Sequence, residues 1–374
     1  MSATEPLRRT PLYDLHVARG GRMVDFAGYE MPVRYSPGPV AEHQHTRQAA
    51  SIFDVSHMGV VELAGADVAA HLEALVPSAI TTLAPGRSRY TMLTTPSGGV
   101  IDDLMVTAVD EERLSLVVNA SRKEVDTAHL RAGLPAGVTV VPRPDLALVA
   151  LQGPAAVSVL SGQGPGVAGL VFMQAGRARV AGVDVGLTRS GYTGEDGYEL
   201  SVPADAVAGL VAALLDEPEV ELAGLAARDS LRLEAGLCLY GHDLDEATTP
   251  AEAGLGWAIP KRRREDARFP GAPTILAQLA EGPDRHRVGL VPLGRKPLRD
   301  GAPLLQRAGH GGATVGTVTS GGFGPTFGGP IAMGYVATGS HAVGTELAAD
   351  VRGTLVDCRV VDLPFVPHRY VRGA

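Results

Sequence analysis

The segment 191–199 reads Gly191-Tyr192-Thr193-Gly194-Glu195-Asp196-Gly197-Tyr198-Glu199, a glycine-rich polar insertion between apolar runs. A second polar segment follows it: Gly224-Leu225-Ala226-Ala227-Arg228-Asp229-Ser230-Leu231-Arg232-Leu233-Glu234-Ala235-Gly236. Both segments place charged groups beside apolar runs, where such groups are costly to bury unless they are paired. A planar, nitrogen-rich heterocycle has donors and acceptors, so it would satisfy a carboxylate and an arginine together.

Strands and helices alternate on both sides of these segments. Apolar periodicity predicts strands at 59–63, 90–94, 104–109, 114–119, 146–151, 183–188 and 198–202. It predicts helices at 39–50, 66–75, 122–134 and 204–215. This mixture of strand pairs and helices favours an α+β fold over a doubly wound parallel sheet.

The last quarter of the chain has a different pattern. The segment 261–271 is polar and turn-rich, which suggests the approach to a domain boundary. After residue 285, short strands are expected at 287–292, 315–319, 332–336, 346–351 and 354–361, with glycine-rich turns between them. Such a series predicts a small all-β barrel.

Size and charge exclude some classes of protein. A chain of 374 residues suggests two or three domains. Its hydrophobic content of 45% argues against disorder. The net charge of −8 argues against a nucleic-acid binder, which needs a basic field for phosphate contacts.

Cysteine usage and the N-terminus bear on location. The two cysteines, Cys238 and Cys358, cannot make a disulfide framework, so a reducing compartment is expected. Residues 1–10 have no apolar core of signal-peptide length. No apolar run approaches the roughly 20 residues that span a membrane. We therefore expect a soluble cytoplasmic protein without a membrane segment.

Two acidic motifs have competing interpretations. Asp102 and Asp103 would form a solvated turn before the strand at 104–109, or one of them would point inward, because neighbours in an extended chain face opposite sides. A buried carboxylate with a shifted pKa suits proton transfer at a nitrogen. Glu195 fits an exposed hairpin tip, whereas Glu199 lies inside the following strand and could accept two parallel hydrogen bonds.

The arginines of the second polar segment also have two interpretations. Arg228 and Arg232 are four residues apart on an expected helix and so share a face. That face would pair at the surface with Asp229 and Glu234, or it would contact a ligand.

Metal, hydrolase and nucleotide sites are not expected. His43 and His45 diverge on a helix, and no cysteine near them in sequence completes a metal site. His57 has no evident acid partner or nucleophile in the sequence. Gly321-Gly322-Phe323-Gly324 lacks the Gly-Lys-Ser/Thr of a phosphate loop.

Motifs along nearly the whole chain carry a family resemblance. Besides the two polar segments they are Thr10-Pro11-Leu12-Tyr13-Asp14, residues 24–33, Phe53-Asp54-Val55-Ser56-His57-Met58, residues 98–104, Leu239-Tyr240-Gly241-His242-Asp243-Leu244, residues 316–322 and Pro364-Phe365-Val366-Pro367. In this order and spacing they resemble the aminomethyltransferases of the glycine cleavage system, the folate-using T-proteins. Tyr29 stands where tryptophan is common in that family, which keeps an aromatic ring with a polar group.

The resemblance implies a fold and a reaction. It implies three domains in a cloverleaf around a central folate channel: 1–52 with 141–270, then 53–140, then the C-terminal barrel at 280–374. The cofactor would be tetrahydrofolate and the partner the lipoylated H-protein. The aminomethyl group on the dihydrolipoyl arm would give its methylene to folate and release ammonia. Segment 261–264 is either a basic surface for H-protein or, as we expect, a solvated run of charges.

The resemblance also assigns roles to residues. Asp103 would be catalytic, near the reactive folate nitrogens, while Asp102 would stay in the solvated turn. Glu199 would hold the pterin ring and Arg228 would contact the ligand, with Arg232 supporting the loop or a carboxylate. The remaining positions expected to bind folate are Met58, Tyr90, Tyr192, Arg287 and Tyr370.

Two other functions stay open at this stage. One is a folate-dependent demethylase or oxidase of the same superfamily, although no Gly-x-Gly-x-x-Gly announces the flavin domain of the oxidases. The other is a non-catalytic folate-binding protein, although the Lys-Gly-Cys stretch of those proteins is missing.

Overall fold

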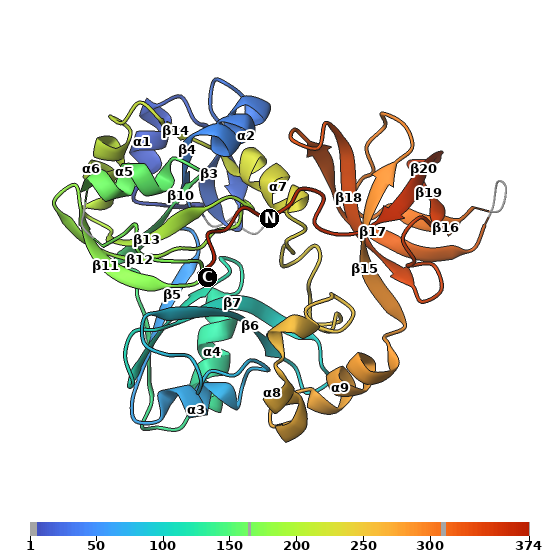
Figure 1. The fold of residues 1–374 in the computed structure, drawn as a ribbon, viewed down its shortest axis with the longest axis horizontal. Helices are drawn as coiled ribbons and strands as arrows, with labels where there is room; N and C mark the ends of the chain where they lie inside the picture. The colour runs from blue at the N-terminus through green and yellow to red at the C-terminus, as the bar shows by residue number, and fades with distance from the viewer. Residues whose placement is uncertain (1–5, 164–165, 308–311, 374) are drawn as a thin grey trace.

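The computed structural model describes residues 6–163, 166–307 and 312–373. These residues form three lobes around a centre (Figure 1). The expected α+β architecture with a C-terminal all-β barrel is confirmed. The domain limits expected from the sequence stay a prediction, and residues 1–5 and 374 lie outside the described ranges.

The first lobe is built on a six-stranded sheet in the order β11-β12-β13-β10-β4-β14. Its strands are β4 (Ala50–Asp54), β10 (Leu146–Gln152), β11 (Ala175–Val180), β12 (Val183–Thr188), β13 (Gly197–Pro203) and β14 (Val220–Leu222). Its helices are α1 (Tyr13–Ala18), α2 (Pro39–Gln48), α5 (Ala156–Gln163), α6 (Val207–Leu214) and α7 (Leu225–Glu234). The central strand β10 is a continuous apolar run because it is buried on both faces. A small sheet of β1 (Arg8–Arg9), β3 (Tyr29–Arg34) and β2 (Arg22–Phe26) adjoins this lobe.

The second lobe is a five-stranded sheet in the order β6-β7-β8-β5-β9. It contains β5 (Gly59–Ala64), β6 (Arg87–Thr94), β7 (Val100–Ala108), β8 (Arg113–Val118), β9 (Thr139–Pro142), α3 (Val68–Glu73) and α4 (Lys123–Gly133). From Asp102 to Ala108, buried and half-buried residues alternate along β7, the pattern of a strand with one face in the core.

The third lobe is a closed barrel in the order β15-β18-β17-β16-β19-β20. Its strands are β15 (Arg285–Pro292), β16 (Pro303–Gln306), β17 (Thr314–Gly324), β18 (Gly329–Ala337), β19 (Glu346–Val351) and β20 (Thr354–Val361). Closure leaves no unpaired sheet edge. The short strand β16 was not expected from the sequence.

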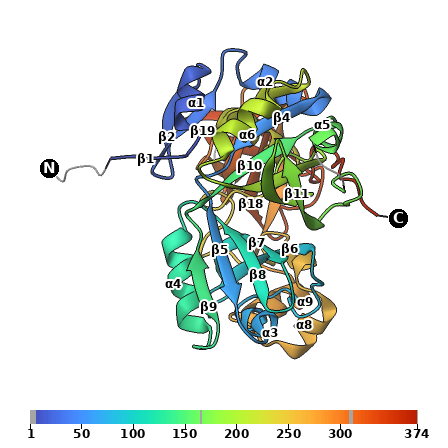
Figure 2. The same cartoon turned by 90° about the vertical axis from the view of Figure 1, so that its left-hand side faces the viewer.

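The chain after β20 returns from the barrel to the first lobe. The backbone N–H of Arg369 donates to the carbonyl of Gly194 (2.8 Å), and that of Phe172 donates to Val371 (2.7 Å). This C-terminal tail, residues 362–373, runs through the centre of the molecule (Figure 1). It emerges on the side opposite β1 (Figure 2).

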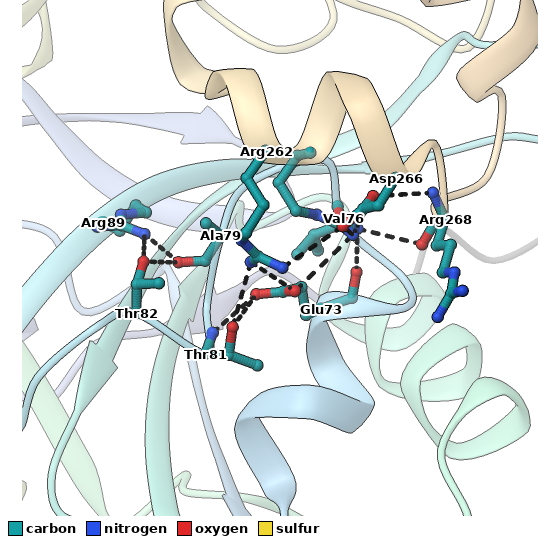
Figure 3. Close-up of polar contacts among 10 residues, drawn as sticks. Glu73, Val76, Ala79, Thr81, Thr82, Arg89, Arg262, Asp266 and Arg268 are labelled. Atoms are coloured by element: carbon teal, nitrogen blue, oxygen red, sulfur yellow. Dashed lines mark hydrogen bonds and ion pairs between the residues drawn. The ribbon is translucent and has the colours of Figure 1, made fainter.

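The segment 261–271, expected to be turn-rich throughout, is helical from Lys261 to Asp266, which is a correction. Helix α8 (Lys261–Asp266) and helix α9 (Ala272–Glu281) follow a short 3₁₀ turn, η1 (Gly256–Ala258). The run of charges at 261–264 is also not simply solvated. Arg263 is only 2% exposed and donates to the carbonyls of Glu73 (2.6 Å) and Val76 (3.0 Å). Arg262 reaches the Glu73 carboxylate at 2.7 Å (Figure 3). The free carbonyls around the end of α3 explain why an arginine is buried there.

No helix within the described ranges is long and apolar enough to cross a membrane.

Candidate active site

A cavity of about 1580 Å³ lies where the three lobes meet. Every residue that the sequence assigned to the site lines it, and each is half-buried, as the wall of a cavity requires. These residues are Met58, Tyr90, Asp103, Tyr192, Glu199, Arg228, Arg287 and Tyr370. The topology therefore brings together side chains from all three lobes and from the C-terminal tail.

Asp103 lies on β7 and is held by two donors. The Tyr90 hydroxyl, from β6, donates to Oδ2 at 3.0 Å, and the Asn119 amide donates to Oδ1 at 2.9 Å. Burial raises the pKa of Asp103 to about 7, and the charge of Asp102 adds to the rise. The carboxyl is thus fixed in place and titrates near neutral pH.

The expectation of a solvated Asp102 is wrong. Strand β7 begins at Val100, so both aspartates lie within the strand, and Asp102 is fully buried on the other face. It accepts hydrogen bonds from the Asn119 backbone N–H (3.0 Å) and side-chain amide (2.9 Å). Sequence reasoning missed Asn119. The antiparallel register of β7 and β8, continued by two residues, places it opposite Asp103 and would have found it.

Glu199 and Arg228 face the cavity with unused hydrogen-bonding capacity. Glu199, on β13, accepts from the Ser190 hydroxyl at 2.6 Å. The guanidinium of Arg228, on α7, lies over the Tyr192 ring at 4.6 Å. Its buried Nη1 donates to no partner in the described ranges. Burial lowers the pKa of Arg228, yet an arginine stays charged at any ordinary pH. An acceptor-only carboxylate and a donor-only cation can together bind a planar group that carries both donors and acceptors.

Two further charged residues of the glycine-rich and helical segments, Glu195 and Arg232, bind other groups of the protein. Arg232 is 3% exposed and donates to Asp243 and to the Ser320 hydroxyl, both at 2.9 Å, so its surface interpretation is wrong. Glu195 is 1% exposed and accepts from Arg47 (3.0 Å) and Arg369 (3.1 Å), so it is not an exposed hairpin tip. Both hold the cavity-lining segments in place.

The aromatic and barrel residues complete the wall. Tyr370 stacks on Phe172 with ring centroids 4.1 Å apart. The Tyr192 hydroxyl donates to the Cys238 carbonyl. Arg287 donates to the carbonyls of Ala253 and Gly236, each at 2.9 Å. These contacts fix the orientations of the side chains before any ligand binds.

Two further cavity residues were not assigned to the site from the sequence. Trp257, on η1, stacks on Tyr90 with ring centroids 5.6 Å apart. His57 is 4% exposed and packs edge-on against Phe26. Burial lowers the pKa of His57 to about 4, so the ring is neutral at pH 7. Both positions depend on chain segments that meet only in the folded molecule.

Metal ligation has no candidate cluster: the described ranges contain no group of three or more histidine, cysteine, aspartate or glutamate side chains placed to hold an ion.

Comparison with known proteins matches the two parts of the chain separately. A family model described as the GCVT N-terminal domain matches residues 12–263. A second model, described as the glycine cleavage T-protein C-terminal barrel domain, matches residues 285–367.

Similar proteins match the chain over almost its full length. The mitochondrial aminomethyltransferase of Homo sapiens is 46% identical, covering 98% of this chain and 92% of the relative. That of Gallus gallus is 47% identical, covering 99% and 95%. The crystal structure of the glycine cleavage system aminomethyltransferase T from Bartonella henselae is 43% identical with a TM-score of 0.92, covering 98% of this chain and all of that one.

Proposed function

This chain belongs to the glycine cleavage T-protein family, and from this premise we propose the reaction that it performs. It is an aminomethyltransferase. In the proposed reaction, the methylene of an aminomethyl group on the dihydrolipoyl arm of H-protein passes to tetrahydrofolate, and ammonia is released. The observation that carries the proposal is the convergence of Asp103, Glu199 and Arg228 on one cavity.

The proposed folate site uses the free capacity of two side chains. Glu199 accepts one hydrogen bond, from Ser190, and can accept a parallel pair from an amino-pyrimidine edge. Arg228 offers its unpartnered Nη1. Tyr370 and Met58 supply apolar wall beside them. Tetrahydrofolate, when bound, supplies the nitrogens that accept the methylene.

Asp103 has the properties of a residue that moves a proton. A pKa of about 7 leaves both protonation states populated at neutral pH, which is where a general acid or base is most effective. The hydrogen bonds from Tyr90 and Asn119 keep the carboxyl oriented, so the protein contributes position as well as charge. We propose that Asp103 orients, or exchanges a proton with, the reacting folate nitrogen.

The size and shape of the cavity support a second ligand. Pockets for one small molecule usually measure about 300–1,000 Å³, and this cavity is about 1580 Å³. Phe26 and Ala27, at the end of β2 and just after it, line the cavity, and so do Tyr370 and Arg372 of the C-terminal tail. Strand β2 and the C-terminus lie toward opposite sides of the molecule (Figure 2). The lipoyl arm of H-protein and the folate would then enter from opposite sides.

The cytoplasmic location stays a prediction, and the relatives above are named as mitochondrial.

The test is ammonia release from aminomethyl-loaded H-protein, with and without tetrahydrofolate, by the wild type and by Asp103→Asn. We expect release that depends on folate and falls steeply in the variant while folate still binds. Binding of tetrahydrofolate without ammonia release by the wild type would contradict the H-protein reaction. A demethylase or a folate-binding protein would then be the function to test.

A further inference from the structure

A second pair of carboxyl groups lies behind the wall that carries Asp103. Asp126, on α4, is fully buried, and so is Asp102, on the face of β7 opposite Asp103. The carboxyls of Asp102 and Asp126 lie within hydrogen-bonding reach of each other. The proposed function uses neither of them.

Asp126 and Asp102 differ in the donors that they meet. In the described ranges no N–H or O–H group donates to either oxygen of Asp126. Asp102 accepts two hydrogen bonds from Asn119. A buried carboxylate ion without donors is far costlier than the neutral acid. Asp126 is therefore the member of the pair that carries a proton, and an oxygen of Asp102 is the acceptor within its reach.

Asn119 connects this pair to the cavity. Its side-chain amide donates to Oδ1 of Asp102 and to Oδ1 of Asp103, each at 2.9 Å. Its orientation is therefore shared between the buried aspartate and the cavity aspartate. A change in the position of Asp102 therefore reaches Asp103 through this amide group, and a change in its charge also acts on Asp103 directly.

We propose that Asp126 is a positioning residue that holds one proton against Asp102 and thereby fixes, through Asn119, the Asp103 carboxyl. The shared proton also keeps a second negative charge away from Asp103. This inference rests on the proposed role of Asp103. Asp126 itself does not line the cavity.

The charges around the pair agree with one shared proton. Burial raises the pKa of Asp126 to about 9, and the charge of Asp102 adds to the rise. Burial raises the pKa of Asp102 as well. The other charges acting on Asp126 are Asp103, on β7, and Arg122, in the turn before α4. The positive charge of Arg122 favours the ionised forms of Asp102 and Asp126, but its guanidinium is already paired with Glu246 at 2.6 Å.

An infrared measurement tests the proton directly, whatever the reaction. At pH 8 Asp103 is mostly ionised and Asp126 is not, given their pKa values of about 7 and about 9. We expect the carbonyl band of a buried carboxylic acid in the wild type at pH 8 and its loss in Asp126→Asn. A wild type without the band, or a band unchanged in the variant, would show that Asp126 does not hold the proton.

Kinetics test the consequence for Asp103. Asp126→Asn keeps a donor toward Asp102, whereas Asp126→Leu keeps the branched shape in a larger side chain and has no donor. We expect kcat within about twofold of the wild type for the asparagine variant and a fall of roughly tenfold to a hundredfold for the leucine variant, with the KM for tetrahydrofolate little changed. In Asp126→Leu the pH limb near 7 should also move to lower pH, because Asp102 then takes up the proton and no longer raises the pKa of Asp103.

Each outcome of the kinetics decides the inference. A leucine variant with the kcat and pH profile of the wild type would remove the positioning role. An asparagine variant as slow as the leucine variant would show that the carboxyl must ionise. If Asp126→Leu does not fold, Asp126→Asn and the infrared band still decide, and they do so even if the wild type releases no ammonia.

Discussion

The raised pKa of Asp103 makes the stability of the folded protein depend on pH. Its pKa is raised by burial to about 7, above the value of about 3.9 in an unfolded chain. The folded state therefore loses stability as pH rises from about 4 to about 7, because over this range the folded carboxyl keeps its proton while the unfolded one ionises. An asparagine at this position has no charge to bury.

We accordingly expect Asp103→Asn to gain stability over the wild type at pH 8.5 but not at pH 4. The gain should be about 2–4 kcal/mol, since each pKa unit corresponds to roughly 1.4 kcal/mol. Denaturant unfolding at both pH values measures it. The control is Asp184→Asn, whose side chain is 90% exposed and should show no such trend. A gain of equal size at both pH values would contradict the raised pKa.

Trp257 is the only tryptophan of the chain and stacks on the tyrosine that holds Asp103. We expect Trp257→Ala to lower kcat/KM by about two- to tenfold, because an aromatic pair contributes roughly 0.5–1.5 kcal/mol. Trp257→Phe keeps a ring and should retain most of the activity. Because Trp257 lines the cavity, its fluorescence should also change when tetrahydrofolate is added to the wild type. Unaltered emission at saturating folate would place the ligand elsewhere.

At the scale of elements, regular strands were predictable and the elements at lobe junctions were not. The barrel strands β15, β17, β18, β19 and β20 were expected because alternation and glycine turns are local signals. The start of β7 was missed because Asp-Asp resembles a turn, and the donors of Asn119 that satisfy a buried Asp102 come from another strand's end. Helix α8 was missed because its stability comes from carbonyls of another lobe.

Helix α8 contains two neighbouring arginines with very different surroundings. Arg263 is buried and bonded to Asp266 and to three backbone carbonyls, whereas the side chain of Arg262 is 48% exposed. We expect Arg263→Lys to destabilise the protein by about 3–5 kcal/mol, because an ammonium cannot reach all of these acceptors and would leave buried carbonyls without a donor. The matched variant Arg262→Lys should cost about 1 kcal/mol or less. Thermal unfolding compares the two variants. Equal losses of stability would contradict the different surroundings described for the two arginines.

At the scale of the whole molecule, one carboxylate joins the barrel to the first lobe. Glu234, at the end of α7, accepts from the backbone N–H groups of Thr326 (2.7 Å) and Phe327 (3.0 Å), in the turn between β17 and β18. It also binds Arg47 of α2 at 2.9 Å. Burial alone would raise the pKa of Glu234, but the hydrogen bonds from His43 and the barrel turn hold it at about 2.

We expect Glu234→Gln to destabilise the protein by about 3–5 kcal/mol at pH 7, because Arg47 and His43 lose a buried partner. A lowered pKa contributes stability above the unfolded value of about 4.3 and loses it as pH falls toward 2. The difference between variant and wild type should therefore shrink between pH 4 and pH 2. Chemical denaturation over this range measures it, with the exposed Glu281→Gln as a control. A difference that does not depend on pH would mean that packing, not charge, joins the lobes.

The candidate site was predictable as a set of residues but not as an arrangement. All eight assigned residues line one cavity, because the family resemblance identified positions that are far apart in sequence. Asn119, Trp257 and Asp126 were not identified, since each acts through a neighbour that only the folded lobes supply. Contacts between lobes leave no periodic pattern in the chain.

The returning C-terminal tail also affects synthesis on the ribosome. The cavity is lined by segments from Phe26 to Gly373, so it draws on early and late parts of translation alike. All strands of the sheets and of the barrel precede residue 362, yet a nascent chain arrested before Arg369 has no Tyr370 to complete the wall. Completion of the cavity therefore waits until the C-terminal tail has left the exit tunnel.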